Sequence, residues 1–485
     1  MDSTARLTDR HTGTRPTTTP PGRSGVPPAA AFPPGPGRRR RAARVLADNW
    51  TGSSTVPSRR LYPHQWSWDS AFIAIGLRHV SPLRAQTELE TLLAAQWGDG
   101  RVPHIVFDPA VPDGSYFPGP GFWRSAAAGR AAGAPTVQRT SGIVQPPVHA
   151  LAAWLVHRAD PELSRARGFL ARAHPRLAAW HRYLLRHRDL GGGSLAAVVH
   201  PWEQGMDNSP CWDAPLARVT PAPAHTFRRA DLDHGTAPDR PTDRDYGRYV
   251  RLATHYRDGG YRDGHRRARA RGFAVEDPAF NALLIASEHA LGHIADSLGL
   301  SGARRHARAE RLTAALVERL WDPAAGQFRC RDLVGGHLIG ERGVSGLVPL
   351  LLPTLPRPVV GALVHTLTGP HFGVGATTRL PPSYDLLGDS FDPRRYWRGP
   401  AWFNTAWLLE RGLRAHGERE RADTLRTAVV ELADSSGYAE YLHPRTGEPH
   451  GASGFGWTAA LALDLTHDEG ASDEPGAAET DGGAR

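Results

Sequence analysis

The stretch FNALLIASEHALGHIADSLGLSGARRHARAERLTAALVERL, residues 280–320, decides the fold. Its large apolar residues recur every three or four positions, at Phe280, Leu284, Leu291, Ile294 and Leu298 and then at Leu312, Leu316 and Leu320. This spacing places them on one face of each of two helices. Gly299 ends the first helix, and Ser301 can cap the second. The stretch therefore predicts two helices that fold back on each other as a hairpin.

Helix hairpins of this kind recur along the chain. The pattern returns in the pairs 67–79 with 82–97 and 146–157 with 163–187, and in a pair that begins at Trp402, Ala406, Leu409 and Leu413 and is interrupted by Gly417. About a dozen such helices, joined by long loops rich in Trp, Tyr, Gly and Pro, predict an all-α toroid of helix pairs. No strand–helix alternation is visible, which argues against Rossmann and TIM folds. The absence of a fixed-period repeat argues against a solenoid.

Length and composition predict one large domain with a tail at each end. The chain has 485 residues, of which 40% are hydrophobic, and its 14 Trp suit a sizeable core. Residues 1–42, rich in Pro and Arg, are expected to be a disordered extension, residues 43–467 one globular domain, and residues 468–485 a disordered acidic tail. We find no signal-peptide pattern and no apolar run that could span a membrane, so a cytoplasmic location is expected. Two cysteines, Cys211 and Cys330, make neither a disulfide framework nor a Cys-based metal site.

The net charge of +9 comes from arginine alone, because the sequence contains no lysine. That absence excludes P-loop phosphate-binding proteins and enzymes that form a Schiff base through lysine. A basic chain could bind nucleic acid. The arginines are scattered, however, apart from the runs at 38–44 and 264–272, and we interpret them as solvated charges. An Arg-rich nucleic-acid-binding protein is a competing hypothesis, which requires a basic stripe on one face.

Four loop segments combine aromatic side chains with isolated carboxylates. They are LYPHQWSWDSAF (61–72), HPWEQGMDNSPCWD (200–213), DSFDPRRYWRGPAWFN (389–404) and AEYLHPRTGEPHGASGFGWTAA (439–460). Sugars need this combination, because their C–H faces stack on aromatic rings while their hydroxyls bind acids, arginines and amides. The competing interpretation is structural: tryptophans in a large helical protein are often core, and carboxylates beside them often cap helices or pair with arginine. Four such segments in one chain favour a sugar site.

Glycoside hydrolysis needs two carboxyl groups that flank the scissile bond. One donates a proton to the leaving oxygen, so it must stay protonated near pH 7, and apolar cover raises its pKa. Asp207 follows Met206 directly and lies between Trp202 and Trp212 in the sequence, which suits that role. The second carboxyl group must be ionised to activate water or to attack the sugar. Asp207 is therefore our hypothesis for the acid.

Other motifs are weaker. His289 and His293 are spaced i, i+4 and could form a metal pair, but HALGH lacks the glutamate of HExxH, and we interpret it as a solvated helix face. GVGATT, residues 373–378, lacks the third glycine of a dinucleotide loop, and there is no GxSxG nucleophile motif. We expect neither a metal nor an organic cofactor.

At these residues the chain resembles glycoside hydrolase family 63, in the bacterial branch of mannosylglycerate and glucosylglycerate hydrolases. The resemblance covers about residues 43–467. Its motifs are YPHQWSWDSAF, QWGDGRVPHIVF, SGIVQPPVHA, HPWEQGMDNSPCW, RPTDRDYGRY, YWRGPAW and EYLHPRTGEPHG with GFGWTAA. The chain is more distantly similar to trehalases. The resemblance implies an (α/α)6 barrel with long active-site loops.

The same resemblance implies an inverting mechanism, with Asp207 as general acid and Glu440 as general base. It places the sugar pocket at Tyr62, Gln65, Trp66, Ser67, Trp68, Asp69, Gly205, Tyr396 and Trp397. Arg240 would bind the glycerate carboxylate, since a guanidinium matches it bidentately, and Tyr116 and Gln145 would assist. Carboxyl groups roughly 6.5–9.5 Å apart fit inversion, whereas about 5–5.5 Å fits retention.

The expected partner is a small glycoside. The RPTDRDYGRYVRLATHYRDGGYRD segment looks closer to the glucosylglycerate hydrolases, which favours cleavage of glucosylglycerate to glucose and glycerate. Mannosylglycerate, or another small α-glucoside of the trehalase or debranching type, is the nearest alternative, because glucosyl and mannosyl differ at one hydroxyl. A non-catalytic sugar-binding helical protein is an alternative of another class. A homo-oligomer is compatible with the sequence.

Overall fold

In the computed structural model, residues 36–232 and 239–467 are described. The hairpin of the quoted stretch is present as α13, Pro278–Ser297, and α14, Ala303–Leu320. Asp277 caps α13 by accepting a hydrogen bond from the Phe280 amide at 2.8 Å. Gly299 turns the chain with a φ of +74°. We had expected Ser301 to cap α14, but it does not. Gly302 precedes the helix instead, and its amide donates to Asp296 Oδ1 at 2.7 Å.

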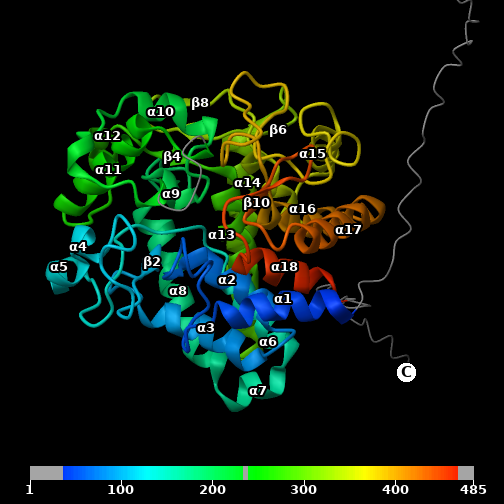
Figure 1. Ribbon diagram of the computed structural model, residues 1–485, viewed down its shortest axis with the longest axis horizontal. Helices are drawn as coiled ribbons and strands as arrows, with labels where there is room; N and C mark the ends of the chain where they lie inside the picture. Colours follow the sequence, from blue (N-terminus) through cyan, green and yellow to red (C-terminus); the bar gives the residue numbers. More distant parts are fainter. Residues whose placement is uncertain (1–35, 233–238, 468–485) are drawn as a thin grey trace, which may run out of the picture. The chain divides into compact units, whose positions relative to one another are not determined.

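Helix pairs close into a ring (Figure 1). The inner elements among the described residues, each packed against the next, are α2 (Ser67–Leu77), α6 (His149–Ala159), α13, the 3₁₀ helix η6 (Val348–Leu351), α16 (Phe403–Ala415) and α18 (Gly456–Leu465). The red helix α18 packs on the blue helix α2, which closes the ring between the two ends of the domain. The predicted toroid, an (α/α)6 barrel, is confirmed.

A second layer of helices lies outside this ring. It consists of α3 (Pro82–Ala94), α8 (Phe169–His187), α14, α15 (Arg357–Thr368), α17 (Arg419–Ser435) and α1 (Pro36–Asp48). The predicted hairpin partners 67–79 with 82–97 correspond to α2 and α3. The segment 163–187 is not one helix, because Gly168 takes a φ of +60° and separates α8 from the short helix α7, Pro161–Ala166.

Helix α1 corrects the expected domain boundary after residue 42. The helix begins at Pro36, and Ala42 and Leu46 are buried in the core. Arg41 donates two hydrogen bonds, of 2.7 and 2.6 Å, to the carboxylate of Asp434 on α17. Residues 36–42 are therefore folded, because an Arg-rich sequence can still pack its apolar stripe while its charges reach outward. Residues 1–35 and 468–485, where we predict disorder, lie outside the described residues.

The inner helices are buried on all sides, whereas their sequence pattern had indicated one buried face. Every residue of α2 and α18 is buried. Helices α2 and α18 cross so closely that a Cβ on Gly76 would come within 2.3 Å of the Ala460 carbonyl oxygen. A helix surrounded by other helices needs apolar or small residues all round rather than on one face.

Short antiparallel strands of two residues shape the loops, and the sequence did not predict them. They are β1 (Gln65–Trp66) with β2 (Ile105–Val106); β9 (Ala401–Trp402), β10 (Tyr441–Leu442) and β11 (Pro449–His450); β3 (Ala197–Val198), β4 (Val275–Glu276), β7 (Arg331–Asp332) and β8 (His337–Leu338); and β5 (Trp321–Asp322) with β6 (Gln327–Phe328). Pairs this short show no alternation of polar and apolar residues that could reveal them.

The remaining helices are mostly short and lie in the connections. They are α4 (Pro120–Trp123), α5 (Ser125–Ala132), α9 (Pro201–Gln204), η1 (Pro210–Trp212), α10 (Asp213–Ala217), η2 (Ala224–Thr226), η3 (Ala230–Leu232), α11 (Asp243–Asp258), α12 (His265–Arg271) and η5 (Val344–Gly346). Both α11 and α12 lie in the long connection between α8 and α13.

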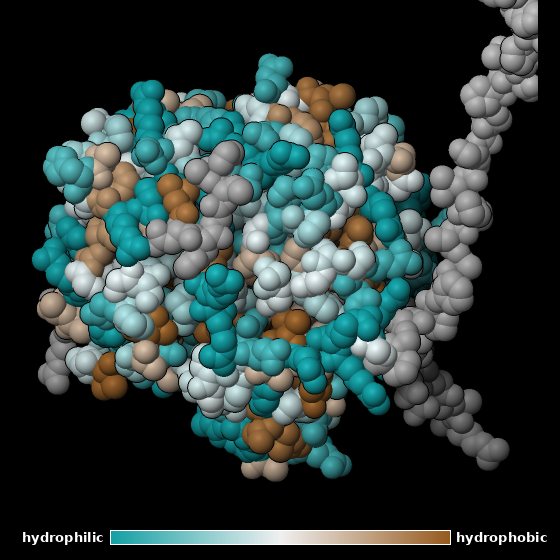
Figure 2. Space-filling view, in the orientation of Figure 1, coloured by the Kyte–Doolittle hydropathy of each residue, from teal (hydrophilic) through white to brown (hydrophobic). Residues whose placement is uncertain are grey.

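The surface is largely hydrophilic. Figure 2 shows hydrophobic residues only singly or in small groups on the face in view. Within residues 36–232 and 239–467, no helix combines the length and the apolarity that crossing a membrane requires. Both cysteines are buried and free, and Cys330 donates to Asp277 Oδ2 at 3.2 Å.

Candidate active site

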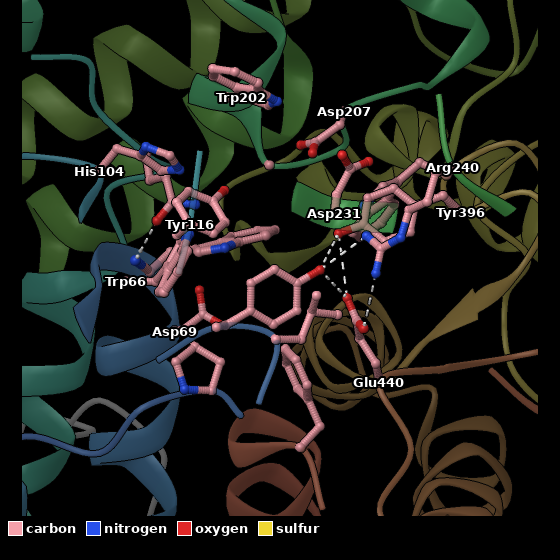
Figure 3. Close-up of a pocket in the computed structure, with 18 of the residues that line it drawn as sticks. Trp66, Asp69, His104, Tyr116, Trp202, Asp207, Asp231, Arg240, Tyr396 and Glu440 are labelled. Atoms are coloured by element: carbon pink, nitrogen blue, oxygen red, sulfur yellow. Dashed lines mark hydrogen bonds and ion pairs between the residues drawn. The ribbon is translucent and has the colours of Figure 1, made fainter. Parts of the chain in front are cut away.

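The four aromatic and acidic segments meet at one pocket (Figure 3). Its lining includes the expected residues Tyr62, Trp66, Trp68, Asp69, Tyr116, Gln145, Gly205, Asp207, Arg240, Tyr396, Trp397 and Glu440. Segments more than 300 residues apart in sequence thus form one cavity, because the ring brings the loops of separate hairpins together. The mixture of aromatic walls and carboxylates suits a sugar.

Glu440 lies at one side of the pocket, where donors surround its carboxylate. Tyr62 and Tyr396 donate to Oε1 at 3.0 and 3.3 Å, and the Ala452 amide donates to Oε2 at 3.0 Å. Arg240 Nη2 lies 4.0 Å from Oε2. Burial raises the pKa of Glu440, and Arg240 together with these hydrogen bonds opposes that rise. The site therefore favours the ionised form of Glu440 more than burial alone would allow.

The segment that carries Glu440 requires a glycine beside the carboxylate. Strand pairing of β10 with β9 and β11 positions the segment that begins at Glu440. Gly451 takes a φ of +71°, and a Cβ there would come within 2.4 Å of Glu440 Oε2. The space that Glu440 occupies therefore explains why the residue after EPH is a glycine, Gly451.

Asp207 faces the same pocket from another direction (Figure 3). Among the residues that the structure describes, its carboxyl group makes no ion pair. Burial raises the pKa of Asp207 to about 7; Glu440 and Asp231 add to this rise, and Arg240 opposes it. A carboxyl group with such a pKa can hold a proton near neutral pH and release it to a leaving oxygen.

Neighbouring segments hold the Asp207 loop in place. Helix α9 ends at Gly205, which takes a φ of +81° and whose Cβ would lie 2.5 Å from the Trp68 ring. Asn208 Oδ1 accepts a hydrogen bond from the Trp397 amide at 2.9 Å. Arg398 donates to both carboxylate oxygens of Asp213, at 2.9 and 2.6 Å. These contacts couple the loop of Asp207 to the segment that carries Tyr396 and Trp397.

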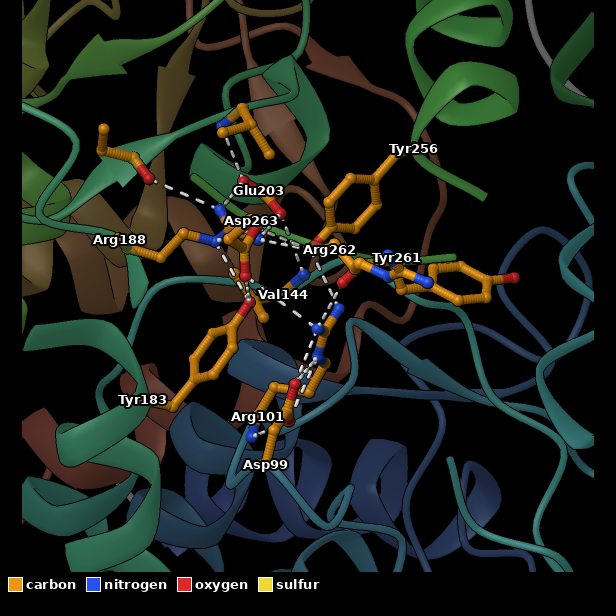
Figure 4. A network of polar contacts seen from close by, with 12 residues as sticks. Asp99, Arg101, Val144, Tyr183, Arg188, Glu203, Tyr256, Tyr261, Arg262 and Asp263 are labelled. Atoms are coloured by element: carbon orange, nitrogen blue, oxygen red, sulfur yellow. Dashed lines mark hydrogen bonds and ion pairs between the residues drawn. The ribbon is translucent and has the colours of Figure 1, made fainter. Parts of the chain in front are cut away.

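A buried polar network lies behind this loop (Figure 4). Glu203 on α9 accepts two hydrogen bonds from Arg188, at 2.5 and 2.6 Å, and both side chains are 0% exposed. Glu203 also accepts from the backbone amides of Val199 and Val144, and Arg188 contacts Asp263 at 3.0 Å. Glu203 thereby fixes α9 before Asp207, and it fixes the segment before Gln145.

Aromatic side chains and Asp69 form the opposite wall. The Tyr116 ring meets the Trp66 ring edge-on at 5.1 Å, and the Trp457 ring meets Trp68 edge-on at 5.2 Å. Gln145 Oε1 accepts from the Trp68 amide at 3.2 Å. Burial, with a further contribution from Glu440, raises the pKa of Asp69 well above its usual value. A buried carboxyl group in this position can exchange hydrogen bonds with sugar hydroxyls.

Arg240 connects the two sides of the pocket. Its Nη1 donates to the Tyr62 hydroxyl at 3.0 Å, and its guanidinium lies 4.6 Å from the centre of the Tyr396 ring. The side chain is buried, 6% exposed, yet lines the cavity. A buried cation at a pocket wall attracts an anionic group of a ligand.

Two expected pocket residues point elsewhere. Gln65 Nε2 donates to the carbonyl and the carboxylate of Glu88 on α3, both at 3.0 Å. Ser67 Oγ lies 2.9 Å from His149 Nε2 on α6. Their neighbours Trp66 and Trp68 line the pocket, so Gln65 and Ser67 face the core instead. The prediction of these two side chains as pocket residues is corrected, because the local backbone direction decides which neighbour faces the cavity.

Several lining residues had not been assigned to the pocket. They are chiefly His104, Asp231, Tyr246 and Phe455. His104 lies in QWGDGRVPHIVF and Tyr246 in RPTDRDYGRY, so their motifs offered a signal. Asp231 belongs to no motif, and Arg229 holds it through two hydrogen bonds of 2.9 and 2.8 Å.

Comparison with known proteins places the chain in a family. The profile described as "Mannosylglycerate hydrolase MGH1-like glycoside hydrolase domain" matches residues 62–458. The chain belongs to this glycoside hydrolase family. The mannosylglycerate hydrolase of Rubrobacter radiotolerans is 42% identical over 427 residues, 87% of this chain and 95% of that protein. The glucosylglycerate hydrolase of Mycolicibacterium hassiacum is 40% identical, over 87% of this chain and 96% of that protein.

Comparison with solved structures supports the same family. The family 63 mannosylglycerate hydrolase of Thermus thermophilus, in complex with Tris and D-glycerate, superposes with a TM-score of 0.80 at 38% identity, over 89% of this chain and 100% of that chain. The neutral trehalase of Saccharomyces cerevisiae, at 14% identity and a TM-score of 0.55 over 86% of this chain and 74% of its own, shares the fold. The expected membership of family 63 is confirmed, and the protein is an enzyme, which sets aside the non-catalytic alternative.

Proposed function

We propose that this hydrolase is an inverting α-glycosidase that cleaves glucosylglycerate to glucose and glycerate, with Asp207 as general acid and Glu440 as general base. The observation that carries the proposal is the contrast between two carboxyl groups in one pocket. Glu440 is surrounded by Tyr62, Tyr396, Arg240 and the Ala452 amide. Asp207, by contrast, has a pKa that burial raises to about 7. Environments that differ in this way separate an acid from a base.

The proposed reaction moves two protons and replaces the glycosidic C–O bond with a C–O bond to water. Asp207 donates its proton to the glycosidic oxygen, and the bond from that oxygen to the anomeric carbon breaks. Glu440 accepts a proton from a water molecule, whose oxygen attacks the anomeric carbon from the opposite face. Glycerate leaves with the proton of Asp207, and the sugar is released with inverted configuration. No cofactor enters this proposal.

The glycerate part of the substrate rests on Arg240. Both relatives described above are hydrolases of glycerate glycosides. The buried guanidinium of Arg240 lines the pocket beside both carboxyl groups, where it can pair with the carboxylate of a glycerate. Mannosylglycerate is the second candidate, because the mannosylglycerate hydrolase of Rubrobacter radiotolerans is as similar to this chain as the glucosylglycerate hydrolase is.

The first test measures sugar release from glucosylglycerate, mannosylglycerate and trehalose in parallel. We expect turnover of glucosylglycerate and its loss in Asp207→Asn, since an amide cannot donate the proton. NMR of the first product formed should show the β-anomer if inversion holds. Preferred turnover of mannosylglycerate would show that mannosylglycerate is the substrate and would leave the proposed mechanism unchanged. An α-anomer as the first product would refute inversion.

The second test separates recognition of glycerate from catalysis. Arg240→Lys keeps the positive charge beside Glu440 and Asp207 but loses the bidentate fork. We expect KM for the glycerate glycoside to rise at least about tenfold, with a much smaller change for a neutral α-glucoside such as trehalose or a nitrophenyl glucoside, because only the former carries a carboxylate. Equal effects on both substrates would argue against glycerate as the leaving group.

A further inference from the structure

A cluster of metal-ligating side chains lies on the α13–α14 hairpin, away from the pocket. His293 and Asp296 belong to α13, and His306 belongs to α14. One nitrogen or oxygen of each lies within 4.8 Å of the others. His306 Nε2 is 3.5 Å from Asp296 Oδ2, close to the separation of two ligands on one ion. None of the three lines the active-site pocket.

The hairpin geometry brings these groups together. His293 and Asp296 are spaced i, i+3 and so share one face of α13. A Cβ on Gly292 would lie 2.6 Å from the His306 ring, so only a glycine lets α14 bring that imidazole so close. The Gly302 amide holds Asp296 Oδ1 at 2.7 Å, which turns Oδ2 toward His306. The arrangement is thus built into the turn between the two helices.

A further histidine supports the cluster. His289 Nδ1 lies 3.3 Å from His306 Nδ1, so a hydrogen bond between them can keep the lone pair of His306 on Nε2, the nitrogen beside Asp296. The Trp154 ring stacks on His293 with centroids 5.5 Å apart. His289 and His293 are half-buried against α14, which corrects our interpretation of HALGH as a solvated helix face.

We propose that His293, Asp296 and His306 bind a divalent transition-metal ion, Zn²⁺ in the first instance, which links α13 to α14. Two imidazoles and one carboxylate make a three-ligand set that leaves a fourth position for water. The side chains of His306 and Asp296 are 27% and 53% exposed, so an ion can reach them. His289 acts as a positioning residue that orients His306. Arg158, whose charge reaches His293, opposes binding and sets a limit on the affinity.

The test measures Zn²⁺ binding to the full chain, prepared without a His tag and stripped with a chelator. A chromogenic chelator competes for the ion, and the melting temperature is recorded with and without Zn²⁺. We expect one site per chain and a higher melting temperature with one equivalent of Zn²⁺. His293→Gln and His306→Gln should lose the site, and Asp296→Asn should weaken it while keeping the hydrogen bond to the Gly302 amide. His289→Ala should weaken binding about 10- to 100-fold with unchanged stoichiometry.

His365→Gln is the matched control, because His365 is an exposed histidine on α15 that lies outside the cluster. It should bind Zn²⁺ as the wild type does. Each variant must match the wild type in circular dichroism and in glycosidase activity without metal, which separates loss of the site from misfolding. A wild-type chain that binds no stoichiometric Zn²⁺, or His293→Gln and His306→Gln variants that bind it unchanged, would overturn the proposal.

Discussion

Three acids in HPWEQGMDNSPCWD receive three different environments. Glu203 pairs with buried Arg188, and Asp213 pairs with Arg398. Asp207, between them, faces the pocket without an ion pair in the described part of the chain. All three acids lie among tryptophans in sequence, but only tertiary contacts supply or withhold a cation. Burial raises the pKa of Asp207, and no ion pair in the described part of the chain cancels that rise, which makes Asp207 suitable as an acid.

This contrast predicts the pH dependence of kcat/KM. In the proposed mechanism Asp207 must be protonated, and its pKa is raised to about 7, so activity should fall as the pH rises through about 7. Glu440 must be ionised, and its pKa is raised above the usual 4.5, so activity should also fall on acidification, with a limb above pH 4.5. A profile measured with saturating and limiting substrate checks both limbs.

Arg240 provides the control for this assignment. Its charge lowers the pKa of Asp207, so Arg240→Leu should move the alkaline limb to higher pH, whereas Arg240→Lys should move it much less. An alkaline limb that stays in place in Arg240→Leu would mean that a group other than Asp207 controls it.

For single residues of the pocket, sequence motifs were a better guide than composition. Asp207 and Glu440, which both line the pocket, each stand in a segment with aromatic neighbours. Gln65 and Ser67 were misplaced because neighbouring side chains where β1 meets α2 point in different directions, and Gln65 and Ser67 are turned toward Glu88 and His149 in the core. Asp231 was missed because no local pattern marks it.

At the scale of elements, close crossings between inner helices depend on single glycines. Glycine in a helix usually costs about 1 kcal/mol relative to alanine. Gly76→Ala should nevertheless destabilise the protein by about 1–3 kcal/mol, because the new Cβ would lie 2.3 Å from the backbone of Ala460. Urea denaturation measures the change.

Gly361 on α15 is the matched control. No atom lies within 4 Å of a Cβ built there, so Gly361→Ala should stabilise the protein by up to about 1 kcal/mol. If both substitutions stabilise the protein, α2 and α18 must be able to separate slightly without loss of stability. The close crossing would then not be the reason for a glycine at position 76.

Helix hairpins were predicted correctly because a 3–4 spacing of apolar residues is a local pattern. Their boundaries were less well predicted. Gly168 breaks the segment 163–187, and Gly302 rather than Ser301 precedes α14. Gly168 breaks its segment by taking a left-handed conformation, whereas at Gly302 a Cβ would come within 2.4 Å of the Gly292 carbonyl oxygen.

At the scale of the whole molecule, Asp464 joins elements from both ends of the domain. On α18, it accepts hydrogen bonds from Arg78 at 2.9 Å and from Trp407 Nε1 at 2.9 Å, and His79 Nε2 lies 2.8 Å from it. Burial alone would raise its pKa, but Arg78, His79 and Arg411 outweigh burial and hold it below the usual value. The ring is thus closed by a buried ion pair as well as by apolar packing.

Asp464→Asn should destabilise the protein by about 3–5 kcal/mol at pH 7, because it removes a buried negative charge that pairs with Arg78 and His79. The depressed pKa means that the stabilising contribution is present above the unfolded value of about 3.8 and is lost as the pH falls through the folded value. The difference between mutant and wild type should therefore narrow below about pH 4. Denaturant unfolding at several pH values measures it.

Glu418→Gln is the control, because Glu418 pairs with Arg421 at the exposed start of α17. Such a surface pair contributes about 0.2–1 kcal/mol, so little change is expected. Equal losses in both variants would mean that the buried position of Asp464 has no special weight in closing the ring.

By itself, the sequence determined the helical hairpins, the family and the four segments that line the pocket, because each of these rests on a local pattern of residues. Tertiary structure alone decided where the hairpins meet. It decided which of three neighbouring acids makes no ion pair within the described residues, that Gln65 and Ser67 face the core, and that His293, Asp296 and His306 converge. The physical reason is that side-chain direction and pKa depend on neighbours distant in sequence, which only ring closure brings into contact.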